Sequence, residues 1–349
     1  MRLLVLGGTA FLGREVARAA LGRGHEVTCL ARGTSGPPPD GVRWVQADRD
    51  DEEAGLAGVE HEDWDAVVDV ARQPGQVRRS CRLLAPRASH YVFVSTGNVY
   101  ADHESVGTDE SAALLPPLAA EVMADLSDYG SAKVACEGHV LAAFGAERCL
   151  VARAGLIGGP GDVSGRSGYW PWRIAHPSNV AGEVLVPDRL DFPAQVLDVR
   201  DLADWLVRTA EQRTGAVVDA VGETVSFGDL LAVAQDVASA GAPRVLVPAP
   251  VRWLDEVGVQ EWMGPRSLPM WIADPDFAGF TSRPGLLGRQ LGLTCRPLVE
   301  TLRDVLAWEE HRGPDEPRGA GLTDDEEREL LATVPRDDGA GPVPPTLSA

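Results

Sequence analysis

The sequence has few of the residues that would indicate a disulfide scaffold or a metal centre. Its 349 residues include five cysteines, an odd number, which are widely scattered and form no CxxC pair: Cys29, Cys81, Cys136, Cys149 and Cys295. This usage argues against a disulfide framework or a zinc site, and we interpret the cysteines as reduced, buried thiols. The seven histidines form no HExxH or similar spacing, so we expect no bound metal.

Basic charge and long apolar runs are also scarce. The chain has 32 Lys and Arg residues against 52 Asp and Glu residues, a formal net charge of −20. Such an acidic surface repels phosphate backbones and anionic lipids, so we expect no nucleic-acid and no membrane partner. No apolar run approaches the roughly 18 residues needed to cross a bilayer. The apolar start, MRLLVLGGTAFLG, is interrupted by glycines and lacks a convincing cleavage site, which predicts a cytoplasmic location.

Strand-like and helix-like segments alternate through the first half of the chain. A helix is expected from near Phe11, and the strands are nearly all apolar. They are predicted at residues 2–6, 25–31, 42–45, 66–70, 90–94 and 149–152. Alternating, fully apolar strands are typical of a parallel sheet that is covered on both faces. The sequence therefore predicts an α/β fold with a doubly wound parallel sheet, the Rossmann arrangement.

This alternation loosens after about residue 155, where prolines and most of the tryptophans gather. Amphipathic helices are predicted at 198–212 and 225–240, and a short one at 323–333. We expect three regions: a dinucleotide-binding domain over 1–155, with a segment near 190–220 as a candidate to complete its sheet; a smaller, irregular substrate-binding lobe over 156–313; and a tail over 314–349. The tail is rich in Pro, Gly and Asp, and its last dozen or so residues are expected to be disordered.

A glycine-rich turn, GGTAFLG, lies between the first strand and the first helix. Gly7, Gly8 and Gly13 suit a sharp turn at which a pyrophosphate approaches the backbone and the helix N-terminus. The alternative is a tight turn in another kind of α/β protein. The predicted cofactor contacts in this turn are Gly7, Thr9, Ala10, Phe11, Leu12 and Gly13.

The stretch DYGSAKVACE places Tyr129 four residues before Lys133. Residues four apart lie on one helix face. Tyrosine, with an ordinary pKa of about 10, exchanges protons poorly at neutral pH, and a nearby ammonium group lowers that pKa. The pair is therefore a candidate acid–base device, although a bare YxxxK also occurs by chance.

Together, the glycine turn, the strand YVFVSTGNVY and YGSAK resemble the extended short-chain dehydrogenase/reductase family, often labelled NAD-dependent epimerase/dehydratase. The resemblance covers roughly residues 1–310, strongly in the first half. It implies that Thr96, with Ser95 as the alternative, binds the substrate oxygen, that Tyr129 is the acid–base group, and that Lys133 also binds the cofactor ribose. In RAGLIGGPGD, Ala154 and Gly158 replace the family's usual proline and tyrosine.

The family usually has an acidic residue at the end of the second strand, where this chain has Ala31 and Arg32. Because Arg32 can pair with a 2′-phosphate, the resemblance favours NADP(H), with NAD(H) as the alternative. It also implies that Asp48 lies near the adenine. The segment that passes the ribose and nicotinamide comprises Val70, Ala71 and Arg72.

The resemblance leaves three functions open. A carbonyl reductase acting on a small or sugar-like molecule ranks first, since it needs an exchanging cofactor. A sugar-nucleotide epimerase with tightly bound NAD is second, and a cofactor-binding non-enzyme is third. Dehydratases carry acidic residues after the active-site threonine, where Gly97 and Asn98 stand here. Tryptophans of the second half either stack on the substrate or fill the lobe, and relatives commonly form homodimers.

Overall fold

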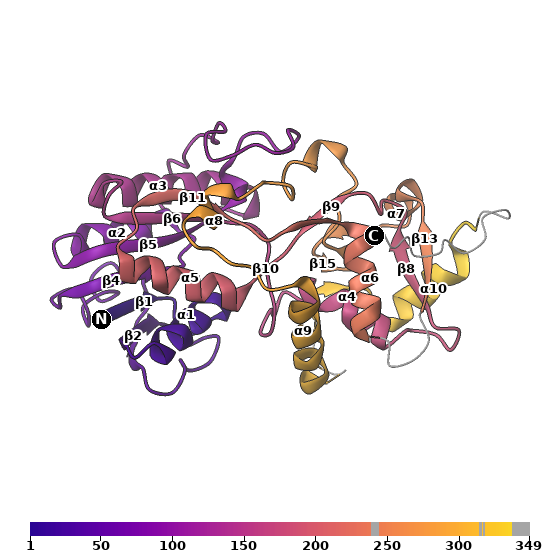
Figure 1. Cartoon of the computed structure of the whole chain (residues 1–349), viewed down its shortest axis with the longest axis horizontal. Coiled ribbons are helices and arrows are strands. Elements are labelled where there is room, and N and C mark those ends of the chain that lie inside the picture. The colour runs from indigo at the N-terminus through magenta and orange to yellow at the C-terminus, as the bar shows by residue number, and fades with distance from the viewer. Residues whose placement is uncertain (239–243, 314–315, 317, 337–349) are drawn as a thin grey trace. The chain divides into compact units, whose positions relative to one another are not determined.

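The computed structural model describes residues 1–238, 244–313, 316 and 318–336 (Figure 1). The chain forms two compact units. Unit 1 comprises Met1–Ile157, Leu197–Glu223 and Arg283–Cys295. Unit 2 comprises Gly158–Val196, Thr224–Ser282 and the described part of Arg296–Ala349. The disorder predicted for the end of the tail, and the last two residues of the helix predicted at 225–240, lie outside the described residues.

Unit 1 is built on a seven-stranded sheet with the strand order β11-β6-β5-β4-β1-β2-β3. Every neighbouring pair is parallel, which confirms the predicted doubly wound fold. The strands are β1 (Arg2–Leu6), β2 (Glu26–Ala31), β3 (Arg43–Gln46), β4 (Trp64–Asp69), β5 (Ala88–Thr96), β6 (Cys149–Ala154) and β11 (Ala216–Ala220). The predicted strands therefore exist, with ends shifted by one or two residues.

Helices cover both faces of this sheet. They are α1 (Phe11–Gly22), α2 (Pro74–Leu84), α3 (Tyr129–Phe144), α5 (Val199–Gln212) and α8 (Leu286–Gln290); unit 1 also holds the short strand β10 (Leu197–Asp198). One hydrophobic cluster joins the sheet to α1 and α5, and a second joins it to α2 and α3. This two-sided burial explains why the strand sequences are nearly all apolar.

The first half of β5 contains a buried polar side chain, that of His90. His90 has no exposed surface, and neither of its ring nitrogens has a hydrogen-bond partner among the described residues. Burial, together with the positive charge of Arg213, lowers the pKa of His90 to about 4. The imidazole is therefore neutral at physiological pH, and protonation inside the fold is unfavourable.

Unit 2 consists of helices and short two-stranded pairs. Its helices are α4 (Arg166–Ala175), α6 (Phe227–Ala238), α7 (Val251–Glu256), α9 (Leu298–Arg312) and α10 (Asp324–Thr333). The strands pair as β8 (Glu183–Pro187) with β13 (Val245–Ala249), β9 (Pro193–Gln195) with β12 (Thr224–Ser226), β14 (Gln260–Trp262) with β16 (Ser267–Pro269), and β15 (Gly264–Pro265) with β17 (Ala320–Gly321). The strand β7 (Ile157–Gly158) lies where the two units divide. The helix predicted at 323–333 is α10, capped by the Thr323 side chain.

Candidate active site

The sheet order reverses between β1 and β4, which places the carboxyl ends of these strands side by side. Leu6 pairs with Asp69, and the Val70 amide donates to the Leu6 carbonyl at 3.2 Å. The glycine turn after β1 and the segment Val70–Arg72 after β4 therefore meet at the carboxyl ends of these two strands. At this position, where the strand order reverses, open α/β sheets bind their ligands.

The glycine turn cannot carry side chains at its tightest points. Gly7 has a φ of +99°, and a Cβ there would come within 2.6 Å of Val70 Cγ2. A Cβ on Gly13 would lie 2.2 Å from the Gly7 carbonyl oxygen. Helix α1 follows at once, and no side chain caps its first turn at Ala10. A close backbone approach and a helix N-terminus without a side-chain cap suit a pyrophosphate. Thr9, Phe11 and Leu12 complete this turn.

Arg32 lies just past β2 with its side chain 56% exposed. Its guanidinium is 3.9 Å from the carboxylate of Asp48, which follows β3. An exposed pair at this distance is weak, so the guanidinium stays accessible to a ligand. The structure thus brings two of the predicted adenosine-side residues together.

Arg14 is a residue that the sequence reasoning missed. It stands in the first turn of α1, and its guanidinium donates to the carbonyls of Thr9 at 3.0 Å and Ser35 at 3.4 Å. It therefore bridges the glycine turn and the loop that follows Arg32. A basic residue in a first helical turn opposes the helix dipole, and this unusual placement was the signal in the sequence.

A buried ion pair supports the end of β4. Arg49 donates two hydrogen bonds to Asp69, at 2.7 and 2.8 Å, and one to Ser80. The Tyr91 hydroxyl donates to the same carboxylate at 2.7 Å. Burial by itself would raise the pKa of Asp69, but the Arg49 guanidinium holds it below its usual range. This pair fixes the strand end that leads into Val70–Arg72.

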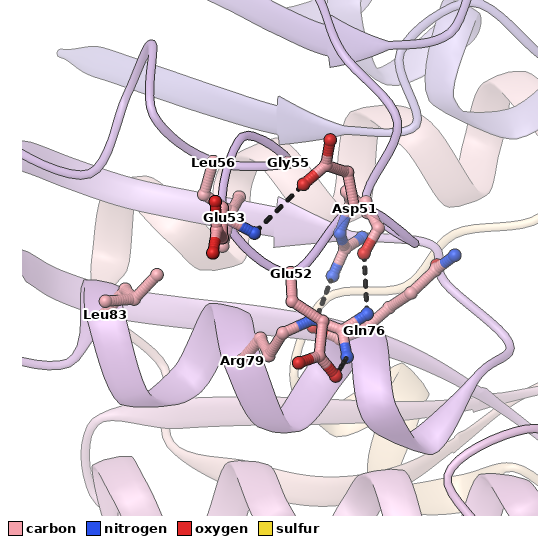
Figure 2. A pocket seen from close by; sticks show the side chains of 9 residues that line it. Asp51, Glu52, Glu53, Gly55, Leu56, Gln76, Arg79 and Leu83 are labelled. Atoms are coloured by element: carbon pink, nitrogen blue, oxygen red, sulfur yellow. Dashed lines mark hydrogen bonds and ion pairs between the residues drawn. The ribbon is translucent and has the colours of Figure 1, made fainter.

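Unit 1 contains two hollows. Figure 2 shows the first, which is lined by Arg49, Asp51, Glu52, Glu53, Gly55, Leu56, Gln76, Arg79 and Leu83. Its volume of about 10 Å³ holds about one water molecule, so it cannot be a cofactor site. The second, about 500 Å³, adjoins Arg2, Trp64 and Ala88, which begin β1, β4 and β5. It therefore lies at the amino ends of the strands.

Thr96 ends β5, next in the sheet to β4. Its hydroxyl donates to the Asn98 side chain at 2.9 Å and accepts from the Asn98 amide at 3.3 Å. The neighbouring Ser95 instead donates at 2.5 Å to the buried carboxylate of Glu137. Of the two candidates from the sequence, Ser95 thus has a structural partner inside the fold, and Thr96 occupies the strand end.

The turn after β5 packs directly on the start of α3. A Cβ at Gly130 would lie 2.3 Å from the Asn98 carbonyl oxygen, so only glycine permits this approach. Tyr129, the residue before it, is half-buried at the first position of α3. The fold therefore brings the Thr96 turn and Tyr129 together from positions more than thirty residues apart.

Lys133 lies one helical turn beyond Tyr129 and is 2% exposed. Its Nζ donates to the carbonyls of Ala71 at 2.8 Å and Val94 at 2.5 Å, and lies 4.2 Å from the ring centre of Phe93. Burial lowers the pKa of Lys133 to about 8. The ammonium thus sits between the ends of β4 and β5, beside the segment predicted to pass the ribose.

Lys133 is also the only lysine among the 32 basic residues of the chain. Every other cationic position is arginine, whose guanidinium is larger and does not lose its proton in proteins. A chain that uses arginine everywhere else and lysine here indicates that this position needs the compact, titratable amine. The signal was readable in the sequence alone.

Unit 2 explains one departure from the family pattern. A Cβ on Gly158 would lie 2.7 Å from both Ser167 Cβ and Val196 Cγ1, so the space of the family's tyrosine is filled. Arg173 is 3% exposed and pairs with Asp324 and Glu327, which makes it a structural residue of the α10 attachment. Trp170 and Trp271 are buried, as expected of core side chains.

The described part of the chain contains neither a metal-ligand cluster nor a membrane-spanning helix. It contains no group of three or more His, Cys, Asp or Glu side chains placed to hold a metal. No helix within those same ranges is long and apolar enough to span a membrane.

Comparison with solved structures supports the fold. The NAD-dependent NDP-hexosamine 5,6-dehydratase TunA superposes with a TM-score of 0.66 at 20% identity, over 90% of this chain and 99% of TunA. A putative epimerase from Burkholderia cenocepacia gives 0.61 at 24% identity, over 88% and 97% of the two chains. The UDP-N-acetylglucosamine 4-epimerase of Bacillus cereus gives 0.64 at 14% identity, over 92% and 100%. At these identities the likeness concerns the fold alone.

Sequence comparison is more specific. The chain is 32% identical over 199 residues to the 2′-dehydrokanamycin reductase of Streptomyces kanamyceticus, covering 54% of this chain and 52% of that protein. It thus spans about half the length of this curated relative. Residues 3–221 match the model of the NAD dependent epimerase/dehydratase family, which is well over half of the chain. Together with the sheet order and the glycine turn, this match shows that the chain belongs to the NAD dependent epimerase/dehydratase family.

Proposed function

We propose that this protein is an NAD(P)H-dependent reductase that converts a carbonyl group of a small, sugar-like molecule into an alcohol, or catalyses the reverse oxidation. The observation that carries this proposal is the placement of Lys133. Its ammonium donates hydrogen bonds to two backbone carbonyls at the carboxyl ends of β4 and β5, one helical turn from Tyr129. The turn that follows Thr96 packs against the start of the same helix.

The bound nicotinamide would supply a hydride to the carbonyl carbon. Tyr129 then donates its phenolic proton to the carbonyl oxygen, so that the C=O bond becomes CH–OH. Thr96 holds that oxygen through its hydroxyl, which exchanges its Asn98 partner for the substrate. Lys133 favours the phenolate left on Tyr129 and binds the ribose of the cofactor.

We further propose a preference for NADP(H). The carboxylate usual at the end of β2 is absent, and Arg32 stands just past Ala31 instead. Arg14 offers a second guanidinium beside the same loop. Structural neighbours of this family have been solved with NAD bound, among them a UDP-glucose 4-epimerase of Thermus thermophilus, so NAD(H) stays the alternative.

The relative's substrate suggests a class of molecule, namely an amine-bearing sugar ketone. In this chain, residues 88–132 contain no Lys or Arg. This stretch includes Thr96 and Tyr129 and carries seven carboxylates: Asp102, Glu104, Asp109, Glu110, Glu121, Asp125 and Asp128. Glu121 pairs with Arg78 at 2.7 Å, and the negative potential of the other six carboxylates would attract a cationic substrate and repel a nucleotide sugar.

The decisive experiment measures NADPH and NADH oxidation with a panel of sugar ketones, amine-bearing and neutral. Tyr129→Phe should bind cofactor normally and lose about a hundredfold or more in turnover, the usual scale of acid–base help. Tyr169→Phe is the matched control, because Tyr169 is likewise a tyrosine, is 2% exposed and belongs to unit 2. Full activity in Tyr129→Phe would refute the assignment.

A sugar-nucleotide epimerase is the second candidate, since several structural neighbours are epimerases. An epimerase keeps its NAD through the catalytic cycle, whereas a reductase exchanges its cofactor each turnover. NAD that copurifies and resists exchange would therefore favour the epimerase. No oxidation of either cofactor across the panel would favour a cofactor-binding non-enzyme. A cytoplasmic location and a homodimer stay predictions.

A further inference from the structure

A second buried ionisable residue, Glu137, shares the face of α3 that carries Tyr129 and Lys133. Glu137 lies four residues after Lys133 and is 3% exposed. Its carboxylate accepts hydrogen bonds from Ser95 at 2.5 Å and from Arg153 at 3.1 and 2.8 Å. Ser95 belongs to β5 and Arg153 to β6, so Glu137 ties the helix to two neighbouring strands.

Arg153 extends these contacts across unit 1. It donates to the Tyr100 hydroxyl at 3.1 Å, and that hydroxyl donates to Asp219 of β11 at 2.6 Å. The Arg283 guanidinium stacks 3.3 Å from the centre of the Tyr100 ring. These side chains are all buried, so the helix is linked to β5, β6 and β11 by a continuous polar network.

We propose that Glu137 is a positioning residue, which with Arg153 and Ser95 fixes α3 against β5 and thereby holds Nζ of Lys133 on the carbonyls of Ala71 and Val94. The residues at 129, 133 and 137 follow the four-residue spacing of one helix face. A shift or rotation of α3 would therefore displace both reaction side chains together. This inference rests on the proposed function for its catalytic consequence but not for its structural one.

Charged groups act on Lys133 from the end of β4 and from α3, whereas β5 contacts it through the Val94 carbonyl and the Phe93 ring. From the end of β4, Asp69 favours the ammonium and Arg72 opposes it; from α3, Glu137 favours it. Cys136 of α3 is uncharged, since burial raises the pKa of its thiol to about 12. Asp69 is already neutralised by two hydrogen bonds from Arg49. Removing the charge of Glu137 would leave Arg153 unbalanced and favour loss of the Lys133 proton.

The use of an ion pair here is itself informative. A buried pair is seldom more stable than apolar residues of similar size, because both charges lose their hydration. Its geometry is more specific, because a bidentate arginine–carboxylate contact tolerates little displacement. Placed one turn from Lys133, the pair supplies a defined position where apolar packing would allow several.

The single lysine makes the test direct. Protein labelled with ¹⁵N,¹³C-lysine gives one lysine side-chain signal, so the protonation of Lys133 is followed by NMR without assignment. In Glu137→Gln this signal should titrate at lower pH than in the unmodified protein, and kcat/KM should fall about tenfold or more, as small displacements of reacting groups do. Glu327→Gln is the matched control, because Glu327 is also fully buried and paired with an arginine, in unit 2. It should leave the Lys133 titration unchanged.

A second variant covers the case in which Glu137→Gln does not fold. Glu137→Leu with Arg153→Met removes both charges and should keep the urea-unfolding midpoint, yet alter the Lys133 signal and lower kcat/KM about tenfold. An unmoved Lys133 signal in both variants, with unchanged kinetics, would overturn the proposal. A moved signal in a protein that reduces no carbonyl would instead leave this inference standing and refute the proposed function.

Discussion

Replacing His90 should make the fold less sensitive to acid. In the native protein this histidine is buried without hydrogen-bond partners, and its pKa is lowered to about 4, first by burial and then by Arg213. In the unfolded chain it titrates near 6.5. The unfolded state therefore binds a proton at His90 that the native state does not bind. The contribution of His90 to stability is fully present above about pH 6.5 and is lost as the pH falls toward 4.

The linkage relation gives the size of the effect. With a pKa of about 4 in the folded state, protonation of His90 in the unfolded chain lowers the free energy of unfolding by about 2 kcal/mol when the pH falls from neutral to about pH 5. His90→Leu should abolish this part of the pH dependence. His61→Leu should not, because the side chain of His61 is 83% exposed. Other titrating groups contribute equally to the pH dependence of the unmodified protein, His90→Leu and His61→Leu.

The measurement is the free energy of unfolding at about pH 7.5 and about pH 5, from urea titrations with hydrogen exchange read in the β4 and β5 peptides. The unmodified protein and His61→Leu should lose about 2 kcal/mol more than His90→Leu. Equal losses in all three would show that His90 is not a buried neutral imidazole. Any change in stability at pH 7.5 reflects packing and has no bearing on this test.

Three further outcomes follow from the site. The value of kcat/KM should fall as the pH rises above about 8, because Lys133 is charged only below its pKa of about 8; a flat pH profile up to about pH 9.5 would contradict this. Arg32→Ala should raise the Kd of NADPH about tenfold and leave that of NADH unchanged, with the exposed Arg82→Ala as control. For an amine-bearing substrate, KM should rise with salt while kcat stays constant, whereas a neutral ketone should show no salt effect.

The sheet and most helices were predictable because their signals are local. Apolar runs such as residues 2–6 and the glycine turn that follows need no knowledge of distant partners. The ends of the strands were less predictable. β4 begins at Trp64 and not near Ala66, because Trp64 pairs with Ala88 of β5. The resemblance likewise identified Thr96, Tyr129 and Lys133 as candidates, and the fold places them near the carboxyl end of β5.

The parts that could not be predicted depend on tertiary contacts. Arg49 and Asp69 are twenty residues apart, and nothing in either segment indicates a buried pair. The hydrogen bond from Ser95 to Glu137 could not be foreseen either, because the two residues are 42 apart in the chain. The unusual position of Arg14 and the single lysine were visible, but each becomes meaningful only beside the element it contacts.

The division of unit 1 into three stretches of chain has a consequence for synthesis on the ribosome. The Tyr100 hydroxyl meets Asp219, 119 residues later, and Arg283 covers the ring from still further along. A nascent chain that ends before β11 leaves β6 as an unpaired edge strand, and one that ends before residue 283 lacks the cover of Tyr100. Although β1 is made first, unit 1 can complete its fold only after its third stretch, Arg283–Cys295, has been synthesised.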